Sequence, residues 1–110
     1  MENSGMLSQI LNSLDEQIVF VDTGHIIRYM NSAAMKHYAK YGELIGKSIF
    51  DCHNPHSCEV IKETFPKLEN GSQEEYIYKT KKHSVYMRSV RDPDGKLLGY
   101  YERYAQLSDG

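Results

Sequence analysis

Hydrophobic residues recur at two different spacings along this chain of 110 residues, and the first spacing is that of a helix. Over residues 6–14 the apolar positions are Met6, Leu7, Ile10, Leu11 and Leu14, which is the i, i+3, i+4, i+7 pattern of one helix face. This pattern predicts a short N-terminal amphipathic helix. Two partners can cover its apolar face: the sheet of the same chain, or the same helix in a second copy.

The second spacing is that of strands. Two short runs, over residues 18–21 and 26–30, are rich in β-branched and aromatic residues, and an Asp-Thr-Gly segment follows the first. Together they predict a β-hairpin. Asn31, followed by a serine, then supplies an N-cap for a helix over residues 33–41, and Gly42 is placed to end it.

A longer helix is expected in the middle of the chain, because apolar residues return to helical spacing at Val60, Ile61, Phe65 and Leu68. Asn54 followed by Pro55 supplies a cap and a first-turn proline, with Ser57 as the competing cap. Pro66 lies too late to begin this helix, so we expect it to kink or end the helix. Just before this region, residues 43–46 predict one further short turn of helix.

The C-terminal third alternates apolar and polar residues and predicts three antiparallel strands, over residues 75–78, 85–90 and 97–105. A Lys-Lys-His segment connects the first two strands. An Asp-Pro-Asp-Gly turn connects the last two, with Pro93 and Gly95 at the positions that suit a type I turn. Strands at both ends of the chain, with helices between them, predict an α+β fold: one five-stranded antiparallel sheet with the helices on one face.

Side chains alternate along a strand, so the last predicted strand presents two different faces. Tyr100, Glu102 and Tyr104 lie on one face, and the other face holds Tyr101, Arg103 and Ala105. Both faces carry aromatic or apolar groups. One face would wall a ligand pocket, and the other would need the N-terminal helix or a partner sheet to cover it. This predicts a homodimer through the helix and the outer sheet face, with the helix folded back on its own sheet as the alternative.

Charge and composition narrow the choice of partners. The 13 basic and 15 acidic residues give a formal net charge of −2, which provides no overall field to hold nucleic acid or an anionic membrane. No window approaches the ~20 apolar residues of a membrane span, and the first residues lack the pattern of a signal peptide. We therefore expect a cytoplasmic protein that binds neither nucleic acid nor membranes directly, with its two cysteines reduced.

Residues 45–58 hold most of the groups that can carry chemistry, including Cys52, His53, His56 and Cys58. Thiolates and imidazoles are the ligands that zinc prefers, so these four side chains are a candidate metal site. Haem needs one axial imidazole or thiolate, which His53, His56 or Cys52 could supply. A thiol switch is a further hypothesis, with Cys52 reactive and Cys58 resolving. In the structural alternative, Cys52 is a small buried hydrophobic residue and His53 hydrogen-bonds within the loop.

The other three histidines are expected to carry less chemistry. His25 and His83 fall in predicted hairpin turns, so we expect both to be solvated. His37 lies on a helix flank, where it is a further candidate for lining a cofactor pocket or, alternatively, a partly buried histidine with its hydrogen bonds satisfied. The sequence carries no catalytic serine, histidine and carboxylate motif and no phosphate-binding glycine loop, so we do not expect an enzyme.

Four segments together resemble the PAS sensory domain. They are Val-Asp-Thr-Gly at residues 21–24, Ile-Arg-Tyr-Met-Asn-Ser-Ala-Ala at 27–34, Leu-Ile-Gly-Lys-Ser at 44–48 and Arg-Asp-Pro-Asp-Gly-Lys-Leu-Leu-Gly at 91–99. Their order and spacing carry the resemblance, which covers residues 11–106. The segment that begins at Gly46 further resembles a bacterial and archaeal subset with a Cys-His-Pro-Pro segment, but Asn54 replaces the first proline and His56 the usual lysine.

The resemblance implies a PAS-like sensor or regulatory input domain of a signal-transduction protein, with a small ligand or cofactor between the sheet and the helices. It divides the chain into a helix at residues 1–14, a PAS-like domain at 15–106 and the start of a linker or tail at 107–110. Haem and a small organic ligand are the two alternatives for the molecule bound between the sheet and the helices. Flavin is disfavoured, because the Asn-Cys-Arg-Phe type segment of light-sensing relatives is missing.

The same resemblance implies two protein partners, a second copy of the chain and a downstream effector domain or signalling protein. Two other functions remain as alternatives. One is a dimerisation module that binds no ligand, and the other is a metal- or redox-sensing protein built on the Cys/His segment.

Overall fold

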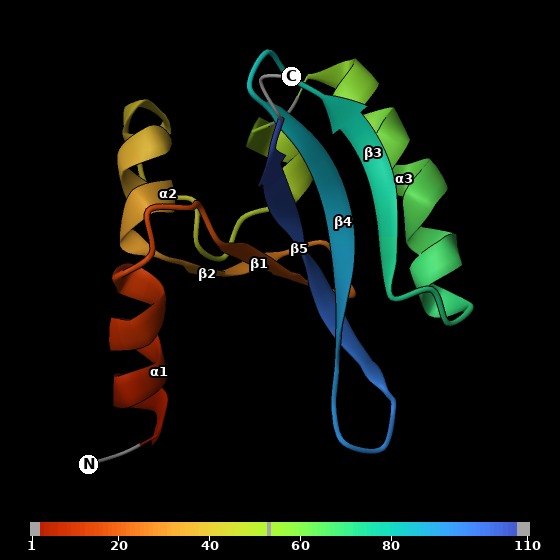
Figure 1. Ribbon diagram of the computed structural model, residues 1–110, viewed down its shortest axis with the longest axis horizontal. Coiled ribbons are helices and arrows are strands. Elements are labelled where there is room, and N and C mark those ends of the chain that lie inside the picture. Colours follow the sequence, from red (N-terminus) through yellow and green to blue (C-terminus); the bar gives the residue numbers. More distant parts are fainter. Residues whose placement is uncertain (1–2, 53, 108–110) are drawn as a thin grey trace.

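The computed structural model describes residues 3–52 and 54–107, without the side chains of residues 3, 4 and 52. The strands form one antiparallel sheet in the order β2-β1-β5-β4-β3 (Figure 1). This confirms the predicted α+β fold with a five-stranded antiparallel sheet. The elements in chain order are α1 (Asn3–Asn12), β1 (Val19–Asp22), β2 (Ile27–Met30), α2 (Ser32–His37), η1 (Ala39–Tyr41), η2 (Ile49–Cys52), α3 (Pro55–Glu69), β3 (Glu74–Lys79), β4 (His83–Arg91) and β5 (Leu97–Gln106).

Helix α3 covers the β3 and β4 end of the sheet, whereas α2 lies at the β2 end (Figure 1). The helical spacing of apolar residues in α3 explains why this helix packs on the sheet, because Ile61, Phe65 and Leu68 are buried in the core. Asn54 is the N-cap of α3, as predicted, and its side chain accepts a hydrogen bond from the backbone N–H of Ser57 at 2.8 Å.

Pro66 is expected to kink or end α3, and the second of these alternatives is wrong, because the helix continues to Glu69. Proline removes one hydrogen bond from the helical ladder. Its neighbours Phe65 and Leu68 are both buried, while Pro66 itself is exposed. The packing of these neighbours holds the backbone in place, so the last turn forms despite the missing bond.

Two further helix predictions need correction. The helix expected over residues 33–41 is split into α2 and η1, because the backbone at Tyr38 leaves the helical conformation. Residues 43–46 form no helix, and residues 45 and 46 lie in a turn in which Gly46 has a positive φ of 92°. A left-handed backbone of this kind suits glycine and interrupts a helix. Gly42 ends η1, as predicted for the end of this region.

The structure decides which face of β5 is the inner one. Tyr100, Glu102 and Tyr104 share the inner face with Val85 and Met87 of β4, which are fully buried. Their neighbours in sequence point to the outer face, as the alternation predicts.

A β-bulge in β3 turns one tyrosine inward. Strict alternation would put Tyr76 and Tyr78 on the same face of the sheet. The register instead pairs Tyr76 with Tyr86 and Tyr78 with Val85, so Ile77 is an extra residue between these pairs. Tyr76 therefore packs against Tyr86 on the outer face, with ring centroids 5.8 Å apart, and Tyr78 joins Val85 on the inner face.

Asn31 connects three parts of the fold, and its side chain is fully buried. Its Oδ1 accepts hydrogen bonds from the backbone N–H of Ala34, at 3.0 Å, and of Ile18, at 2.9 Å. Its Nδ2 donates to the carbonyl oxygens of Leu11 and Glu16, both at 2.9 Å. The predicted N-cap of α2 therefore also ties down the end of α1 and the segment that leads into β1.

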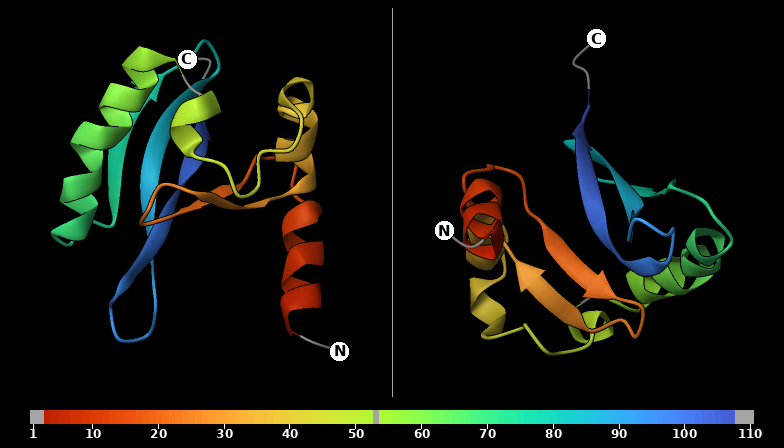
Figure 2. Two further views of the ribbon diagram at one scale, coloured as in Figure 1. Left: turned by 180° about the vertical axis from the view of Figure 1, so that it is seen from behind. Right: turned by 90° about the horizontal axis from the view of Figure 1, so that it is seen from below.

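Helix α1 extends away from the sheet and meets α2 (Figures 1 and 2). Much of its predicted apolar stripe is exposed, since Met6, Leu7 and Ile10 are 49, 58 and 52% exposed. The alternative in which this helix folds back on its own sheet is therefore not the one observed. Within residues 3–52 and 54–107, no helix has both the length and the apolar composition needed to cross a membrane.

Candidate functional site

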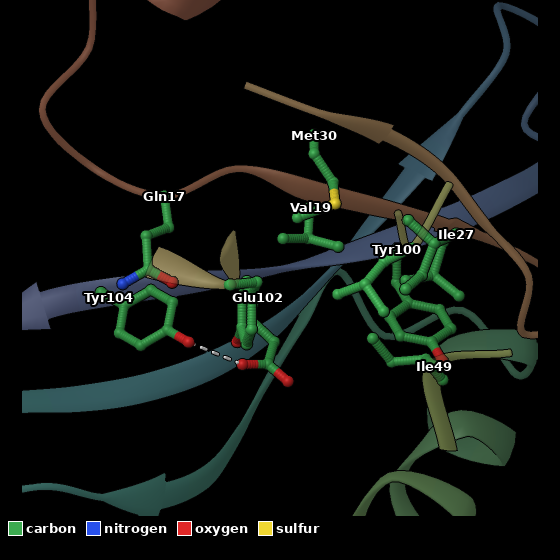
Figure 3. A pocket seen from close by; sticks show the side chains of 11 residues that line it. Gln17, Val19, Ile27, Met30, Ile49, Tyr100, Glu102 and Tyr104 are labelled. Atoms are coloured by element: carbon green, nitrogen blue, oxygen red, sulfur yellow. Dashed lines mark hydrogen bonds between the residues drawn. The ribbon is translucent and has the colours of Figure 1, made fainter. Parts of the chain in front are cut away.

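A small cavity lies inside the domain and is lined mainly by β1, β2 and β5 (Figure 3). Its volume is about 20 Å³, which is room for roughly one water. Most of its walls are apolar, so the few polar groups decide what it can bind. The lining residues are Gln17, Val19, Val21, Ile27, Met30, Tyr38, Leu44, Ile49, Tyr100, Glu102 and Tyr104.

The polar groups gather at one end of this inner cavity. Figure 3 shows Gln17, Glu102 and Tyr104 at that end, with Ile27 at the other. The Glu102 oxygen Oε2 accepts hydrogen bonds from the hydroxyl of Tyr104, at 3.0 Å, and from that of Tyr78, at 3.2 Å. The amide oxygen of Gln17 is buried and has no hydrogen-bond partner among the described residues.

Three separate parts of the chain supply this polar end. Glu102 and Tyr104 come from β5, where alternation places both on the inner face. Tyr78 comes from β3, and the bulge is what brings it to the inner face. Gln17 belongs to the segment before β1, which the hydrogen bonds of Asn31 fix in position.

The tyrosines at this end act as hydrogen-bond donors. Burial, together with the negative charge of Glu102, raises the pKa of Tyr104 far above its usual range. The same two causes raise the pKa of Tyr78. Both hydroxyls therefore stay protonated at neutral pH and donate hydrogen bonds to the Glu102 carboxylate.

A wide groove with a volume of about 1030 Å³ reaches the polar end from outside. Gln17, Tyr38 and Tyr104 line both the groove and the inner cavity, and we refer to these three as the boundary residues. A molecule in the groove therefore lies next to the polar end of the inner cavity. The groove residues are Asp15, Glu16, Gln17, His37, Tyr38, Tyr41, Asn54, Ser57, Tyr78, Thr80, Lys82, His83, Tyr104 and Gln106.

The candidate Cys/His site falls partly outside the described residues, since these include neither His53 nor the side chain of Cys52. His56 is exposed. Cys58 is half-buried, and its thiol donates to the carbonyl oxygen of Phe50 at 3.5 Å. In the described part of the chain, no group of three histidine, cysteine or acidic side chains is arranged to hold a metal ion.

The histidines expected in hairpin turns are less solvated than predicted, and both expectations are wrong. His83 is half-buried, and its ring lies edge-on to that of Tyr104 with centroids 5.8 Å apart. It pairs with the end of β5, which brings it against the ring. His37 is exposed on α2 and lines the groove, not the inner cavity, with its ring edge-on to Tyr38.

His25 packs into an aromatic cluster, although it lies in a turn. Its ring centroid is 4.7 Å from that of Phe65 and 5.0 Å from that of Phe50, and its Nδ1 lies 2.9 Å from the hydroxyl of Tyr100. The turn is fixed by Asp22, whose carboxylate accepts two backbone N–H bonds, and by a φ of 66° at His25. Burial lowers the pKa of His25, so the neutral ring is favoured.

The outer face of the sheet carries a second groove, which we call the outer groove. It has a volume of about 570 Å³ and is lined in part by Leu11, Leu14, Phe20 and Tyr101. Strand β5 contributes to both spaces: Tyr101 and Arg103 line the outer groove, Tyr100 lines the inner cavity, and Glu102 and Tyr104 line both.

Comparison with known proteins identifies the family. A family model for the PAS domain matches residues 7–108, so this chain belongs to the PAS domain family. No curated protein matches the chain.

Solved structures share the fold over nearly the whole chain. A C-terminal domain from Streptococcus mutans is 24% identical, with a TM-score of 0.74 and coverage of 96% of this chain and 89% of that chain. A PAS domain from Colwellia psychrerythraea is 11% identical, with a TM-score of 0.70 and coverage of 99% and 100%. A sensory box sensor histidine kinase from Vibrio cholerae is 16% identical, with a TM-score of 0.66 and coverage of 94% and 91%. Likeness at these identities shows the fold alone.

The pattern of the sequence predicts one part of the polar end but not the rest. Alternation placed Glu102 and Tyr104 together on one strand face. Tyr78 was missed, because a bulge of one residue leaves no mark in the hydrophobic pattern of β3. Gln17 was missed because it lies in a connecting segment, where periodicity carries no information about direction.

Proposed function

We propose that this chain is a sensory input domain of a signal-transduction protein, and that its stimulus is a small molecule bound at the polar end of the inner cavity. PAS domains are sensory domains of signal-transduction proteins, and this chain belongs to that family. The observation that carries the proposal is the Glu102 carboxylate with its two tyrosine donors, at the place where the inner cavity meets the groove. Polar groups cost free energy inside a core, and a polar cluster that outside molecules can approach is typical of a binding site.

Binding at this end has a direct route to the rest of the protein. Gln17 lies next to Glu16, which Asn31 ties to α2 and to the end of α1. Glu102 and Tyr104 lie on β5, whose alternate residues Tyr101 and Arg103 line the outer groove. A ligand that moves β5 or the segment before β1 therefore shifts the position of α1 or of whatever follows β5. An effector domain connected there would receive the change as a shift between two conformations.

The inner cavity does not fit haem. A solved neighbour, the Aer2 receptor from Vibrio cholerae, is described as a PAS-haem oxygen sensor and superposes with a TM-score of 0.53. Pockets for ligands of that size measure about 300–1000 Å³, whereas the inner cavity offers about 20 Å³. The groove is large enough, but side chains such as Asn54, Thr80 and Lys82 make its walls polar. A small polar molecule suits both spaces better.

The Cys/His hypotheses stay separate proposals for residues 52–58. They comprise the zinc site at Cys52, His53, His56 and Cys58, the thiol switch, and the likeness to the Cys-His-Pro-Pro subset. Metal analysis and an absorption spectrum of the purified protein test them together with haem. One zinc per chain would support the metal site, and a Soret band would support haem. If neither is seen, and Cys52→Ala and His53→Ala both behave as wild type, these hypotheses fail.

A dimerisation module is the second candidate function, and one observation favours it. The apolar stripe of α1 is about half exposed, and the outer groove lies between this helix and the sheet. A second copy of the chain that packs against α1 would remove this apolar surface from water. Dimerisation is compatible with sensing, because α1 is joined to the polar end through Gln17 and Asn31.

Two-dimensional NMR of the isotope-labelled protein tests the sensory function. We expect at least one compound from a library of small polar metabolites to shift the amide signals of Gln17, Glu102 and Tyr104 in a saturable way. Tyr78→Phe removes a donor from the polar end and should weaken that binding. Tyr76→Phe is the matched control, because this tyrosine lies on the outer face of the same strand. If no compound shifts these signals in the folded protein, the proposal is wrong.

A further inference from the structure

We infer that His25 is a pH-dependent switch: protonation of its ring releases the β1–β2 turn from the contact that it makes with η2, α3 and β5. The proton is then a second stimulus of this domain, separate from the small molecule of the proposed function. Three features of the structure support this role, namely the position of the ring, its hydrogen-bond partner and the charges that surround it.

The ring of His25 lies where the turn meets three other parts of the fold. Its centroid is 5.0 Å from that of Phe50 in η2 and 4.7 Å from that of Phe65 in α3. The ring of Tyr100, in β5, is 5.8 Å away. The carbonyl oxygen of His25 also accepts a hydrogen bond from the backbone N–H of Ile49, at 2.9 Å, so the turn and η2 are joined by the backbone as well. A change in the position of this ring therefore acts on three elements at once.

The hydrogen-bond partner of the ring responds to its charge. Nδ1 of His25 lies 2.9 Å from the hydroxyl oxygen of Tyr100, which is 1% exposed and keeps its proton because burial raises its pKa. A neutral imidazole has one donor and one acceptor nitrogen, whereas a protonated ring has two donors and no acceptor. The Tyr100 hydroxyl must then accept from the ring and find another acceptor for its own proton inside the core.

Burial is the largest influence on the charge of the ring, and it lowers the pKa of His25. Charged side chains face the ring from β1 and α3: Asp22 and Glu69 favour the charged form and Lys62 opposes it. The Asp22 carboxylate is also paired with Arg28, at 2.6 Å from its Nε. The other two elements at the ring, η2 and β5, contribute neutral aromatic side chains. A protonated ring is therefore more stable in water than in this cluster.

The turn allows the ring to reach water without a change in the backbone. The Asp22 carboxylate accepts hydrogen bonds from the N–H groups of Gly24 and Ile26, and these bonds do not involve the ring. Thr23 and Gly24 are exposed and His25 is half-buried, so rotation of the side chain brings the ring to solvent. In water the ring titrates near its ordinary pKa of 6.5. Between the two pKa values, each unit of pH therefore favours the released form by up to about ten-fold.

Release of the ring reaches the inner cavity through Tyr100. Figure 3 shows Tyr100 at the end of the inner cavity that holds Ile27, away from Gln17 and Tyr104. Tyr100 and Tyr104 both lie on the inner face of β5. The proton and a small molecule therefore act on the same strand from opposite ends of one cavity.

A pH titration of the isotope-labelled full chain, followed by two-dimensional NMR between about pH 8 and about pH 5, tests this switch. We expect the ring signals of His25 to titrate with a midpoint below pH 6.5. The amide signals of Ile49, Phe65 and Tyr100 should change with the same midpoint. Far-ultraviolet circular dichroism should stay constant over this range, because the helices and the sheet remain folded. His25→Asn removes the titrating ring and suits the positive φ of 66° at this position, so the shared midpoint should disappear.

His37→Asn is the matched control, because it removes an exposed histidine of α2 that lies outside the cluster, and it should leave the midpoint unchanged. The switch is overturned if His25 titrates at or above pH 6.5, or if the three amide signals do not follow its ring. It is also overturned if the midpoint survives in His25→Asn, or if the circular dichroism is lost with the same midpoint, because the whole fold then opens. If His25→Asn fails to fold, the wild-type titration decides alone. Each of these outcomes leaves the small-molecule proposal standing.

Discussion

Replacement of Asn31 by alanine tests how the fold holds α1 and the segment before β1. The substitution removes four hydrogen bonds at once, two accepted by Oδ1 and two donated by Nδ2. Because the side chain is fully buried, water does not replace the two bonds that its Oδ1 accepts. We expect the largest structural effect at the junction of α1 with α2.

The expected loss in free energy of unfolding is the sum of the losses at the four groups that hydrogen-bond to Asn31. Loss of the N-cap bond to Ala34 costs about 1 kcal/mol in free energy of unfolding. The N–H of Ile18 is left without its partner, which costs about 1–2 kcal/mol more. Leu11 and Glu16 are partly exposed or exposed, so their carbonyl oxygens can bind water and add less. The sum is about 3 kcal/mol, a large part of the roughly 5–15 kcal/mol that stabilises a domain.

Asn54→Ala is the matched control, since Asn54 is also an N-cap but is exposed and caps a single N–H. Urea unfolding followed by circular dichroism measures both variants. We expect a loss of about 1 kcal/mol for Asn54→Ala. For Asn31→Ala the midpoint should fall by roughly 2 M urea, taking about 1.5 kcal/mol per M for the slope. Hydrogen exchange at the backbone N–H of Ile18 should also become faster in this variant.

One result would refute the reasoning. If Asn31→Ala costs within about 0.5 kcal/mol of Asn54→Ala, the buried hydrogen bonds contribute nothing beyond a surface cap. Unchanged hydrogen exchange at Ile18 would lead to the same conclusion from an independent measurement. The role assigned to Asn31 in connecting the polar end with α1 would then be wrong.

Three further predictions concern the core, a histidine and the dimer. Gly99→Ala would force its Cβ against the carbonyl oxygen of Val21, so we expect a loss of about 3 kcal/mol or more in urea unfolding, and a loss below about 1 kcal/mol contradicts this. Burial lowers the pKa of His25 below 6.5, so the unfolded chain takes up the proton first as the pH falls. The contribution of His25 to stability is therefore present above about pH 6.5 and lost as the pH falls through its lower folded pKa, and His25→Asn should flatten this part of the stability profile. Ile10→Glu should convert a dimer to a monomer in sedimentation, and a wild-type protein that is monomeric at all concentrations contradicts the dimer.

Two controls make these experiments specific. Gly5→Ala changes a glycine with nothing within 4 Å of its added Cβ, so it should not destabilise the fold as Gly99→Ala does. For the pH profile, Asp22 and Glu69 favour the charged form of His25 and Lys62 opposes it. A profile unchanged by His25→Asn would mean that another group titrates in this range.

Periodicity and local capping predicted the five strands, α1 and α3, but not the split of residues 33–41 into α2 and η1 or the short helix η2. The spacing at Ile61, Phe65 and Leu68 predicted α3, and the polar residues Asn31 and Asn54 marked where two helices begin. These features are local, because a cap or an apolar stripe depends on residues within a few positions of each other. Their order along the chain was enough to indicate a PAS-like α+β domain.

The candidate site depended on tertiary structure. Alternation placed Glu102 and Tyr104 on one face of β5, but only the packing of α3 and β4 made that face the inner one. Tyr78 reaches Glu102 because a bulge shifts the register of β3 against β4, and such a shift is set by the partner strand. Gln17 is held in position because its neighbours Glu16 and Ile18 hydrogen-bond to the side chain of Asn31, which lies fourteen positions after Gln17 in the chain.

The sequence by itself determined the five strands, the helices α1 and α3, their order, the helix caps and the two faces of the last strand. Tertiary structure alone decided that His25 is half-buried among aromatic rings, that α1 leaves its apolar stripe exposed, and that a carboxylate lies where a cavity meets a groove. The physical reason is the distance over which each interaction acts. Propensity and periodicity act within one element, whereas burial, register and the charge of a cavity arise only when distant segments meet.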